Sequence, residues 1–175
     1  MMMSMLASGG LEPLTDNIRT ANEDNPKGYF EFEQVKEIEK DSSWLDLAQG
    51  RAVKMISWLL KHLPDRYKYK IIFMRRNMDE VLASQKQMLI RRGQPADPVG
   101  DEKMAAMFQK HLAQIESWLK AQPNIEVAYV SYNEVLADPL PHIEAINSFL
   151  GGSLDVKAMA AVVDLTLYRQ QQSGR

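Results

Sequence analysis

The sequence predicts an α/β fold in which a mostly parallel sheet lies between two layers of helices, as a single domain over residues 1–175. Three short apolar runs, at Val53–Ser57, Ile71–Met74 and Ile125–Val130, are continuous rather than alternating, which is typical of strands buried on both faces of a parallel sheet. A helical pattern follows each run. Strands that alternate with helices pair in parallel through right-handed crossovers, so the three runs predict a three-layer α/β/α arrangement.

Composition and charge narrow the possible functions. Of the 175 residues, 45% are apolar and 25% are charged, which is ordinary for a globular protein with its own core. A formal net charge of −2 argues against a protein that binds nucleic acid through bulk positive charge. No apolar run approaches the ~18 residues of a membrane-spanning helix. The methionine-rich start has no basic region typical of a signal peptide, so we expect a cytoplasmic protein that does not contact a membrane.

Metal and thiol chemistry are not expected. The sequence has no cysteine, which excludes disulfides, a thiol nucleophile and a thiolate metal site. Its three histidines, His62, His111 and His142, are far apart and form no pair with the spacing of metal ligands. We interpret His62 as a surface residue and His111 as a partly buried residue on the apolar stripe of a helix.

Further elements are predicted around the apolar runs. The apolar segment Met1–Ser8, followed by Gly9-Gly10, predicts a helix that ends at the glycines, and Leu11–Leu14 predicts a short strand. Leu154–Val163 predicts a final helix. Between the second and third runs, the segment Asp101–Ala121 predicts a long amphipathic helix, with one apolar stripe formed by Met104, Met107, Phe108, His111, Leu112, Ile115, Trp118 and Leu119.

The polar segment before residue 34 contains an aromatic turn. Asn25-Pro26 and Lys27-Gly28 are turn signals, and aromatic residues that include Tyr29 follow them. An aromatic turn flanked by Lys27 and Glu31 suits a loop that binds a substrate. The alternative is a structural turn whose aromatic side chains fill the core. Both interpretations remain open from the sequence.

The stretch from Tyr69 to Gly93 predicts an anion site. After the apolar run the chain continues through Arg75 and Arg76 into a helix, for which Asn77 is the expected N-cap and Glu80 the capping-box partner. A helix N-terminus attracts anions, and arginine offers a planar charged fork for a phosphate. Ser84, two turns into the helix, adds a hydroxyl. In the alternative interpretation the arginines are solvated and Ser84 bonds to a backbone carbonyl.

The pattern Arg76-Asn77-x-Asp79-x-Val81-x-x-Ser84 resembles the 3′-phosphate-binding element of the sulfotransferases that use 3′-phosphoadenosine 5′-phosphosulfate (PAPS). The resemblance implies the P-loop nucleoside triphosphate hydrolase-like fold of that family. It also implies that Arg76 and Ser84 bind the 3′-phosphate of PAPS, with no metal. The family transfers a sulfuryl group to a hydroxyl or an amine, so the expected partner is a small-molecule or carbohydrate acceptor.

Two other segments resemble the same family. The family usually has Tyr-Glu-Asp-Leu-x-x-Asp-Pro after its third strand, where this chain has Tyr132-Asn133-Glu134-Val135, and the resemblance implies that Tyr132 contacts the adenine ring. Arg169 in the C-terminal tail is a further candidate for cofactor binding. The turn Asn25-Pro26-Lys27-Gly28-Tyr29 resembles a stretch of bacterial sulfotransferase-like proteins, which implies that Lys27 and Tyr29 bind the acceptor. Glu31 is the candidate catalytic base, with a pKa that burial is expected to raise.

One part of the family pattern is missing from the sequence. The family begins with a strand and a phosphosulfate-binding loop, P-R/K-S-G-T-S/T, whereas Met1–Ser8 resembles the helix that follows that loop. We therefore expect an incomplete sulfotransferase domain that is inactive as given. One alternative is a non-catalytic remnant that binds adenine nucleotides or serves as an interaction domain. A P-loop kinase-like phosphotransferase is disfavoured, because no Asp is clearly placed at a strand end for Mg²⁺.

Overall fold

The fold is described by a computed structural model that covers residues 1–19, 28–91, 93 and 100–163. A parallel pair of strands forms its centre, β1 (Tyr69–Arg75) and β2 (Ile125–Ser131), in register from Tyr69 opposite Ile125 to Arg75 opposite Ser131. The α-helices are α1 (Met2–Ser8), α2 (Met78–Arg91), α3 (Asp101–Lys120), α4 (Tyr132–Ala137), α5 (Pro139–Leu150) and α6 (Val156–Ala160). Three 3₁₀ helices, η1 (Glu33–Glu37), η2 (Ser43–Ala48) and η3 (Ser57–His62), lie between α1 and β1 in the chain.

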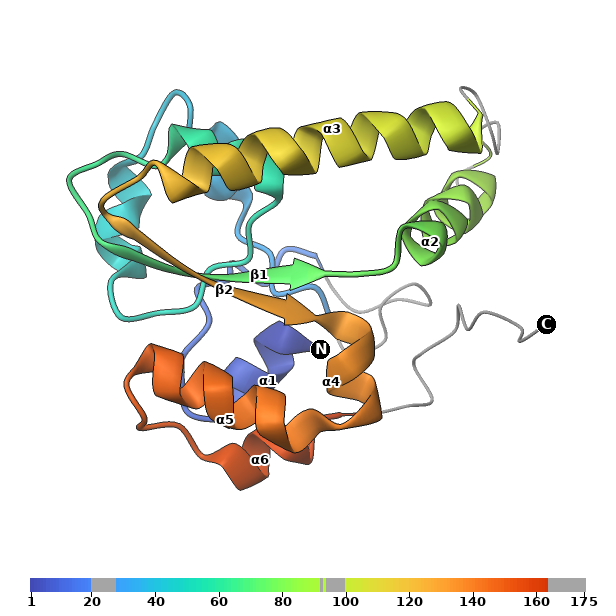
Figure 1. Ribbon diagram of the computed structural model, residues 1–175. Helices are drawn as coiled ribbons and strands as arrows, with labels where there is room; N and C mark the ends of the chain where they lie inside the picture. Colours follow the sequence, from blue (N-terminus) through green and yellow to red (C-terminus); the bar gives the residue numbers. More distant parts are fainter. Residues whose placement is uncertain (20–27, 92, 94–99, 164–175) are drawn as a thin grey trace.

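The helices cover both faces of the two strands. Helix α3 lies along one face, and α1, α5 and α6 lie along the other (Figure 1). Helix α2 continues past the carboxyl end of β1, and α4 follows the carboxyl end of β2 directly. The predicted α/β class and the parallel pairing of the second and third apolar runs are therefore confirmed.

The predicted strand at Val53–Ser57 is wrong. Within the described residues this part of the chain pairs at one point, an isolated parallel bridge between Pro13 and Ala52. The amide of Leu14 donates to the Ala52 carbonyl at 2.8 Å. The short strand predicted at Leu11–Leu14 is therefore reduced to this single bridge. An apolar run becomes a strand only when a neighbouring backbone supplies a ladder of hydrogen bonds, and the described chain supplies none to residues 53–57.

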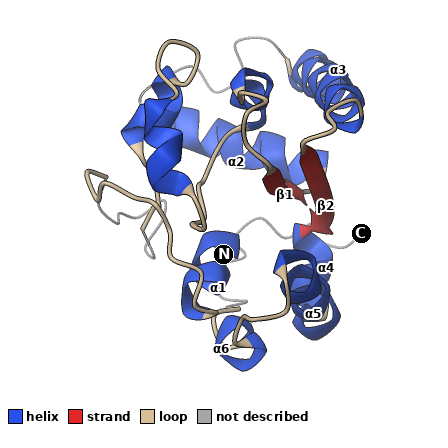
Figure 2. Cartoon of the chain, turned by 90° about the vertical axis from the view of Figure 1, so that its left-hand side faces the viewer, coloured by secondary structure: helices blue, strands red, loops and turns tan. Residues whose placement is uncertain are grey.

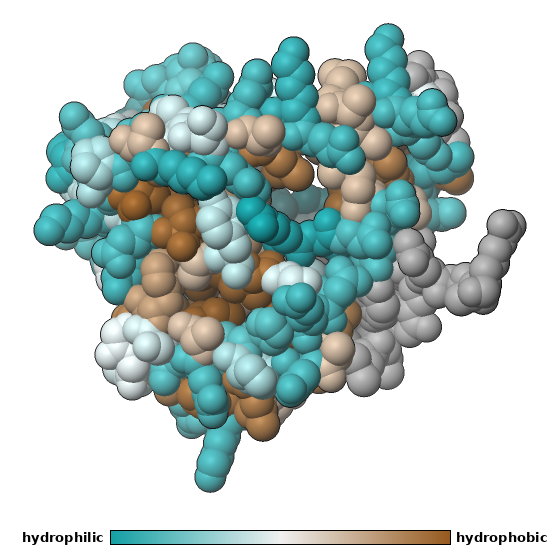
Figure 3. Space-filling view, in the orientation of Figure 1, coloured by the Kyte–Doolittle hydropathy of each residue, from teal (hydrophilic) through white to brown (hydrophobic). Residues whose placement is uncertain are grey.

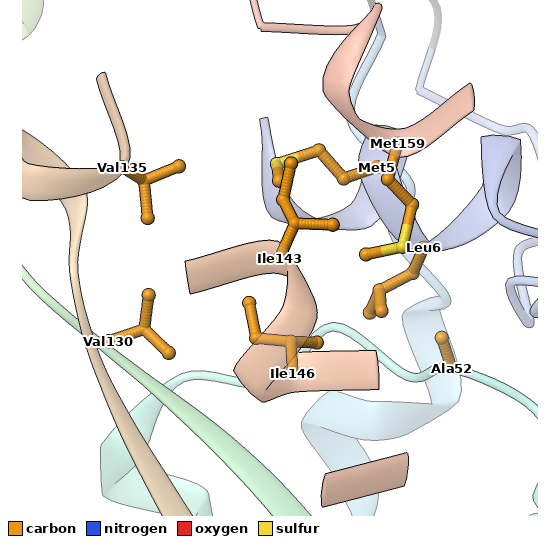
Figure 4. Packing of buried hydrophobic residues seen from close by; sticks show 8 residues of the cluster. All are labelled: Met5, Leu6, Ala52, Val130, Val135, Ile143, Ile146 and Met159. Atoms are coloured by element: carbon orange, nitrogen blue, oxygen red, sulfur yellow. The ribbon is translucent and has the colours of Figure 1, made fainter. Parts of the chain in front are cut away.

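The largest cluster of buried side chains packs α1, α5 and α6 against β2. Met5 of α1, Ile143 of α5 and Met159 of α6 are completely buried, and their side chains meet in Figure 4. The other buried members are Leu6, Ala52, Val130, Val135 and Ile146. Because α1 and α6 are short, this shared burial rather than helix propensity holds them in place.

The buried stripe of α3 is shorter than the sequence predicts. His111, Ile115 and Leu119 are buried as expected, but Met107 is 58% exposed. The first part of α3 extends beyond the strands toward α2 (Figure 1), so its apolar side chains have no sheet to pack against. The final helix is also shorter than the predicted Leu154–Val163, and it begins where the Asp155 carboxylate caps the amide of Ala158 at 2.9 Å.

A cavity of about 1240 Å³ separates β1 from the extended segment 52–56 and the start of η3. Figure 2 shows the strands on one side of the molecule and the chain leading through the 3₁₀ helices on the other. The cavity is lined along β1 by Lys70, Ile71, Ile72, Phe73 and Met74, and along the facing segment by Ala52, Val53, Lys54, Met55 and Ser57. In Figure 3, hydrophobic side chains gather in a recess across the middle of the molecule.

Candidate functional site

The carboxyl end of β1 carries a small pocket that brings Arg76 and Ser84 together. Arg76 directly follows the strand, and Ser84 lies two turns into α2. Helix α2 begins as predicted, with the Asn77 carboxamide oxygen accepting from the Asp79 amide at 2.9 Å. The pocket measures about 260 Å³ and is lined by Arg76, Val81, Ser84, Gln85 and Met88. A permanent positive charge and a hydroxyl therefore share one pocket near a helix start, which is a chemically suitable place for a phosphate.

A buried carboxylate orients Arg76. Its Nε donates to Glu80 Oε2 at 3.0 Å, and Asn133 Nδ2 donates to Glu80 Oε1 at 2.8 Å. Glu80 is only 4% exposed, so hydrogen bonds from partners such as Arg76 and Asn133 must replace the water that would otherwise stabilise its carboxylate. The sequence interpretation treated Glu80 as a capping residue and Asn133 as a departure from a motif. The i, i+4 spacing of Arg76 and Glu80 was the available signal for their pairing.

Tyr132 lies beside Arg76 at the end of the neighbouring strand. It is the first residue of α4, whose N-cap Ser131 accepts from the Glu134 amide at 3.3 Å. The guanidinium carbon of Arg76 lies 4.9 Å from the centroid of the Tyr132 ring, which is a cation–π distance. Burial raises the pKa of Tyr132 despite the opposing effect of the arginine charge, so the phenol is neutral near pH 7. The structure thus brings Arg76, Ser84 and Tyr132 to one edge of the sheet.

The neighbouring Arg75 has different partners. Its guanidinium donates to Glu116 of α3 at 2.7 Å and lies 4.2 Å from the centroid of the Tyr129 ring. Successive residues of a strand point to opposite faces, so two adjacent arginines separate in this way. Arg75 therefore connects β1 to α3 through an ion pair, whereas Arg76 lines the small pocket that also contains Ser84.

Glu31, which follows the predicted aromatic turn in the sequence, lies in a separate cluster of charges. Arg19 and Lys54 bond to Glu31 at 3.2 Å and 3.3 Å, and Lys54 also donates to the Tyr29 carbonyl at 3.0 Å. Burial acts to raise the pKa of Glu31, but the charges and hydrogen bonds of Lys54 and Arg19 outweigh it and lower the pKa. The expectation of a raised pKa for Glu31 is therefore wrong, because the two cations stabilise the ionised carboxylate more than burial destabilises it.

Tyr29 is buried rather than displayed at the surface. It is 8% exposed, and the Arg19 guanidinium lies 3.4 Å from its ring centroid. Tyr29 also lines the large cavity beside β1, so it is both a packing residue and a wall of that cavity. Two other predicted site residues, Lys27 and Arg169, lie outside the described residues.

Comparison with known proteins identifies the family. A model described as the sulfotransferase family matches residues 17–155. The chain belongs to the sulfotransferase family. The matched range contains both strands and the residues Arg76, Ser84 and Tyr132, whereas Arg169 lies outside it. No curated protein and no solved structure matches this sulfotransferase-family chain.

Two general properties of the sulfotransferase-family chain follow from the described residues. Among them, no group of three or more Asp, Glu or His side chains is arranged to hold a metal ion. None of the helices in the described part of the chain is long and apolar enough to cross a membrane.

Proposed function

We propose that this sulfotransferase-family protein binds the 3′-phosphoadenosine part of PAPS through Arg76, Ser84 and Tyr132. The observation that carries the proposal is the pocket in which Arg76 and Ser84 meet at the carboxyl end of β1. Ligands of open α/β sheets bind at that edge. In the proposal the 3′-phosphate enters this pocket, and the adenine ring lies against Tyr132.

The hydrogen bonds of Arg76 support this assignment. Its Nε is bonded to Glu80, and the Nη groups have no hydrogen bond to any of the described residues. A guanidinium held by one edge can offer the other edge to a phosphate without losing side-chain freedom on binding. Glu80 and Asn133 therefore prepare Arg76 for the ligand.

The reaction of the family gives the rest of the proposed function. The sulfur–oxygen bond to the phosphate breaks, a bond to the acceptor hydroxyl or amine forms, and a base takes the acceptor proton. Glu31 remains the proposed base, with Lys27 and Tyr29 on the acceptor side. Its lowered pKa makes Glu31 a weak base, so Glu31→Gln is the decisive variant for this role. A small-molecule or carbohydrate acceptor and a cytoplasmic location also belong to the proposal.

A second candidate function is nucleotide binding without transfer. The sequence contains no P-R/K-S-G-T-S/T loop, which in the family binds the phosphosulfate. Losing even one donor to a developing oxyanion typically costs about 10²–10³ in rate. We therefore expect no transfer from radiolabelled PAPS by the 175-residue chain with a panel of hydroxyl and amine acceptors. Robust transfer would refute this expectation and would mean that other residues replace the loop.

Calorimetry tests the proposed nucleotide site directly. We expect 3′-phosphoadenosine 5′-phosphate to bind at least tenfold more tightly than adenosine 5′-monophosphate, because only the former has a 3′-phosphate for Arg76 and Ser84. Ser84→Ala should reduce this ratio. Ser131→Ala is the control, since Ser131 caps α4 outside the pocket. Equal affinity for the two nucleotides would show that the pocket does not bind a 3′-phosphate.

A further inference from the structure

Outside the proposed nucleotide site, Ser57 and His111 form a hydrogen-bonded pair. Ser57 Oγ lies 2.8 Å from His111 Nε2, although the two residues are 54 positions apart. Ser57 is the first residue of η3, and His111 lies in the middle of α3. Packing of η3 against α3 therefore joins a hydroxyl to an imidazole that the sequence interpretation treated as a core residue.

The His111 ring is held in one orientation. It is 4% exposed, and the indole of Trp58 stacks on it with a centroid distance of 3.7 Å and an interplanar angle of 11°. Burial lowers the pKa of His111, and the positive charge of Lys61 on η3 lowers it further. The imidazole is therefore neutral near pH 7, and a neutral Nε2 with its proton on Nδ1 can accept the proton of Ser57.

Ser57 belongs to the wall of the large cavity beside β1. Apolar side chains, among them Leu60, Phe73 and Leu112, line the same cavity. A hydroxyl in a cavity wall, with a proton acceptor within hydrogen-bond distance, has the arrangement of an activated nucleophile. Ser84, in contrast, shares a pocket with a permanent positive charge and has no histidine within that pocket.

We propose that Ser57 and His111 form a second reactive site, in which Ser57 attacks a tetrahedral sulfur(VI) group that enters the cavity. The Oγ–sulfur bond forms, the bond from sulfur to its leaving group breaks, and the leaving group departs with the electron pair. The Ser57 proton passes to His111 Nε2. With a sulfonyl fluoride the leaving group is fluoride, and the product is a sulfonylated serine.

Labelling with phenylmethanesulfonyl fluoride tests this site on the full chain. We expect one adduct per chain by intact mass, located at Ser57 by peptide mapping. Ser43 is the matched control, because it also begins a 3₁₀ helix but is exposed. Ser57 should react at least tenfold faster than Ser43, and Ser57→Ala should abolish the fast adduct. A lack of label at Ser57, or equal rates at the two serines, would refute the proposal.

The role of His111 is tested by a variant and by pH. His111→Gln should slow labelling about 100-fold, at the lower end for loss of a general base. In the unmodified chain the labelling rate should fall as the pH drops through the His111 pKa. This measurement does not depend on whether the His111→Gln variant folds. A rate that does not fall on acidification while the chain stays folded, or an unchanged rate in a folded His111→Gln chain, would refute the role of His111.

Discussion

At the scale of single residues, the two consecutive arginines at the carboxyl end of β1 have different surroundings. Arg75 is bonded to Glu116 and stacked on Tyr129, whereas Arg76 is oriented by Glu80 beside Ser84 and Tyr132. Their opposite directions follow from the alternation of side chains along an extended chain. Arg75 is thus a natural control for Arg76, since both variants remove the same charge one residue apart.

Arg76→Ala should weaken binding of 3′-phosphoadenosine 5′-phosphate by about 1.5–3 kcal/mol, the usual contribution of a charge-assisted contact. Arg75→Ala should have a much smaller effect on affinity, because that side chain is bonded to α3. Isothermal titration calorimetry of both variants measures the difference. Small and equal losses would show that the phosphate binds elsewhere.

Tyr132→Leu should lower affinity for the same nucleotide by about 1–3 kcal/mol, if a base stacks on the ring. Fluorescence or calorimetric titration measures this loss, and circular dichroism checks that the variant is folded. Unchanged affinity in a folded variant would leave Tyr132 with a structural role only.

Glu80→Gln should reduce both stability and nucleotide discrimination. The carboxylate is buried and accepts hydrogen bonds from Arg76 and Asn133. In the Gln variant an NH₂ group replaces one of the two acceptor oxygens, so one of these donors loses its acceptor. Removing one partner of a buried ion pair typically costs about 3–5 kcal/mol, and the cost here should be smaller because an amide oxygen remains. Urea unfolding measures the stability. The double variant Glu80→Gln, Asn133→Asp restores a carboxylate to the pair and should recover part of the loss.

At the scale of elements, β1 leads into α2 and β2 leads into α4, and the candidate site lies at these two junctions. Helix α2 carries Ser84 back toward Arg76, and α4 presents Tyr132 from the neighbouring strand. The bond between Glu80 and Asn133 connects α2 to α4 directly. Ion pairs also join elements elsewhere in the chain, where Glu31 lies between Arg19 and Lys54.

The aromatic turn should make stability depend on pH. The folded-state pKa of Glu31 is lowered below its ordinary value of 4.5, so its contribution is complete above the unfolded pKa and is lost as the pH falls through the folded pKa. The free energy of unfolding should therefore decrease on acidification below about pH 4.5, and Glu31→Gln should reduce this slope. Urea titrations at several pH values provide the measurement, and an identical slope in the variant would contradict it.

At the scale of the whole molecule, the described sheet has two strands, and a large cavity lies beside it. β1 pairs with β2 on one edge, and its other edge faces a cavity of about 1240 Å³ across which the described chain supplies no paired strand. Unpaired strand edges promote association with other chains. We expect the 175-residue chain to unfold at modest temperature and to associate as its concentration rises, which light scattering during a thermal scan measures. A monomeric chain that unfolds reversibly at high concentration would contradict this.

Much of the fold and part of the site could be predicted from the sequence. The runs at Ile71–Met74 and Ile125–Val130 became paired strands, because a continuous apolar run needs burial on both faces. Arg76 and Ser84 were predicted together from the resemblance to sulfotransferases, and both line one pocket at the start of α2. The run at Val53–Ser57 has the same local character but no ladder partner in the described chain, so local pattern was insufficient there.

By itself the sequence predicted the α/β class, the proposed anion site after β1 and the resemblance to sulfotransferases, because these depend on residue type and near spacing. Only the tertiary structure decided which charges meet. It placed Glu80 between Arg76 and Asn133, surrounded Glu31 with two cations that lower its pKa, and joined His111 to Ser57. Charge pairs and hydrogen bonds depend on distances of a few ångströms between residues far apart in the chain, which packing alone sets.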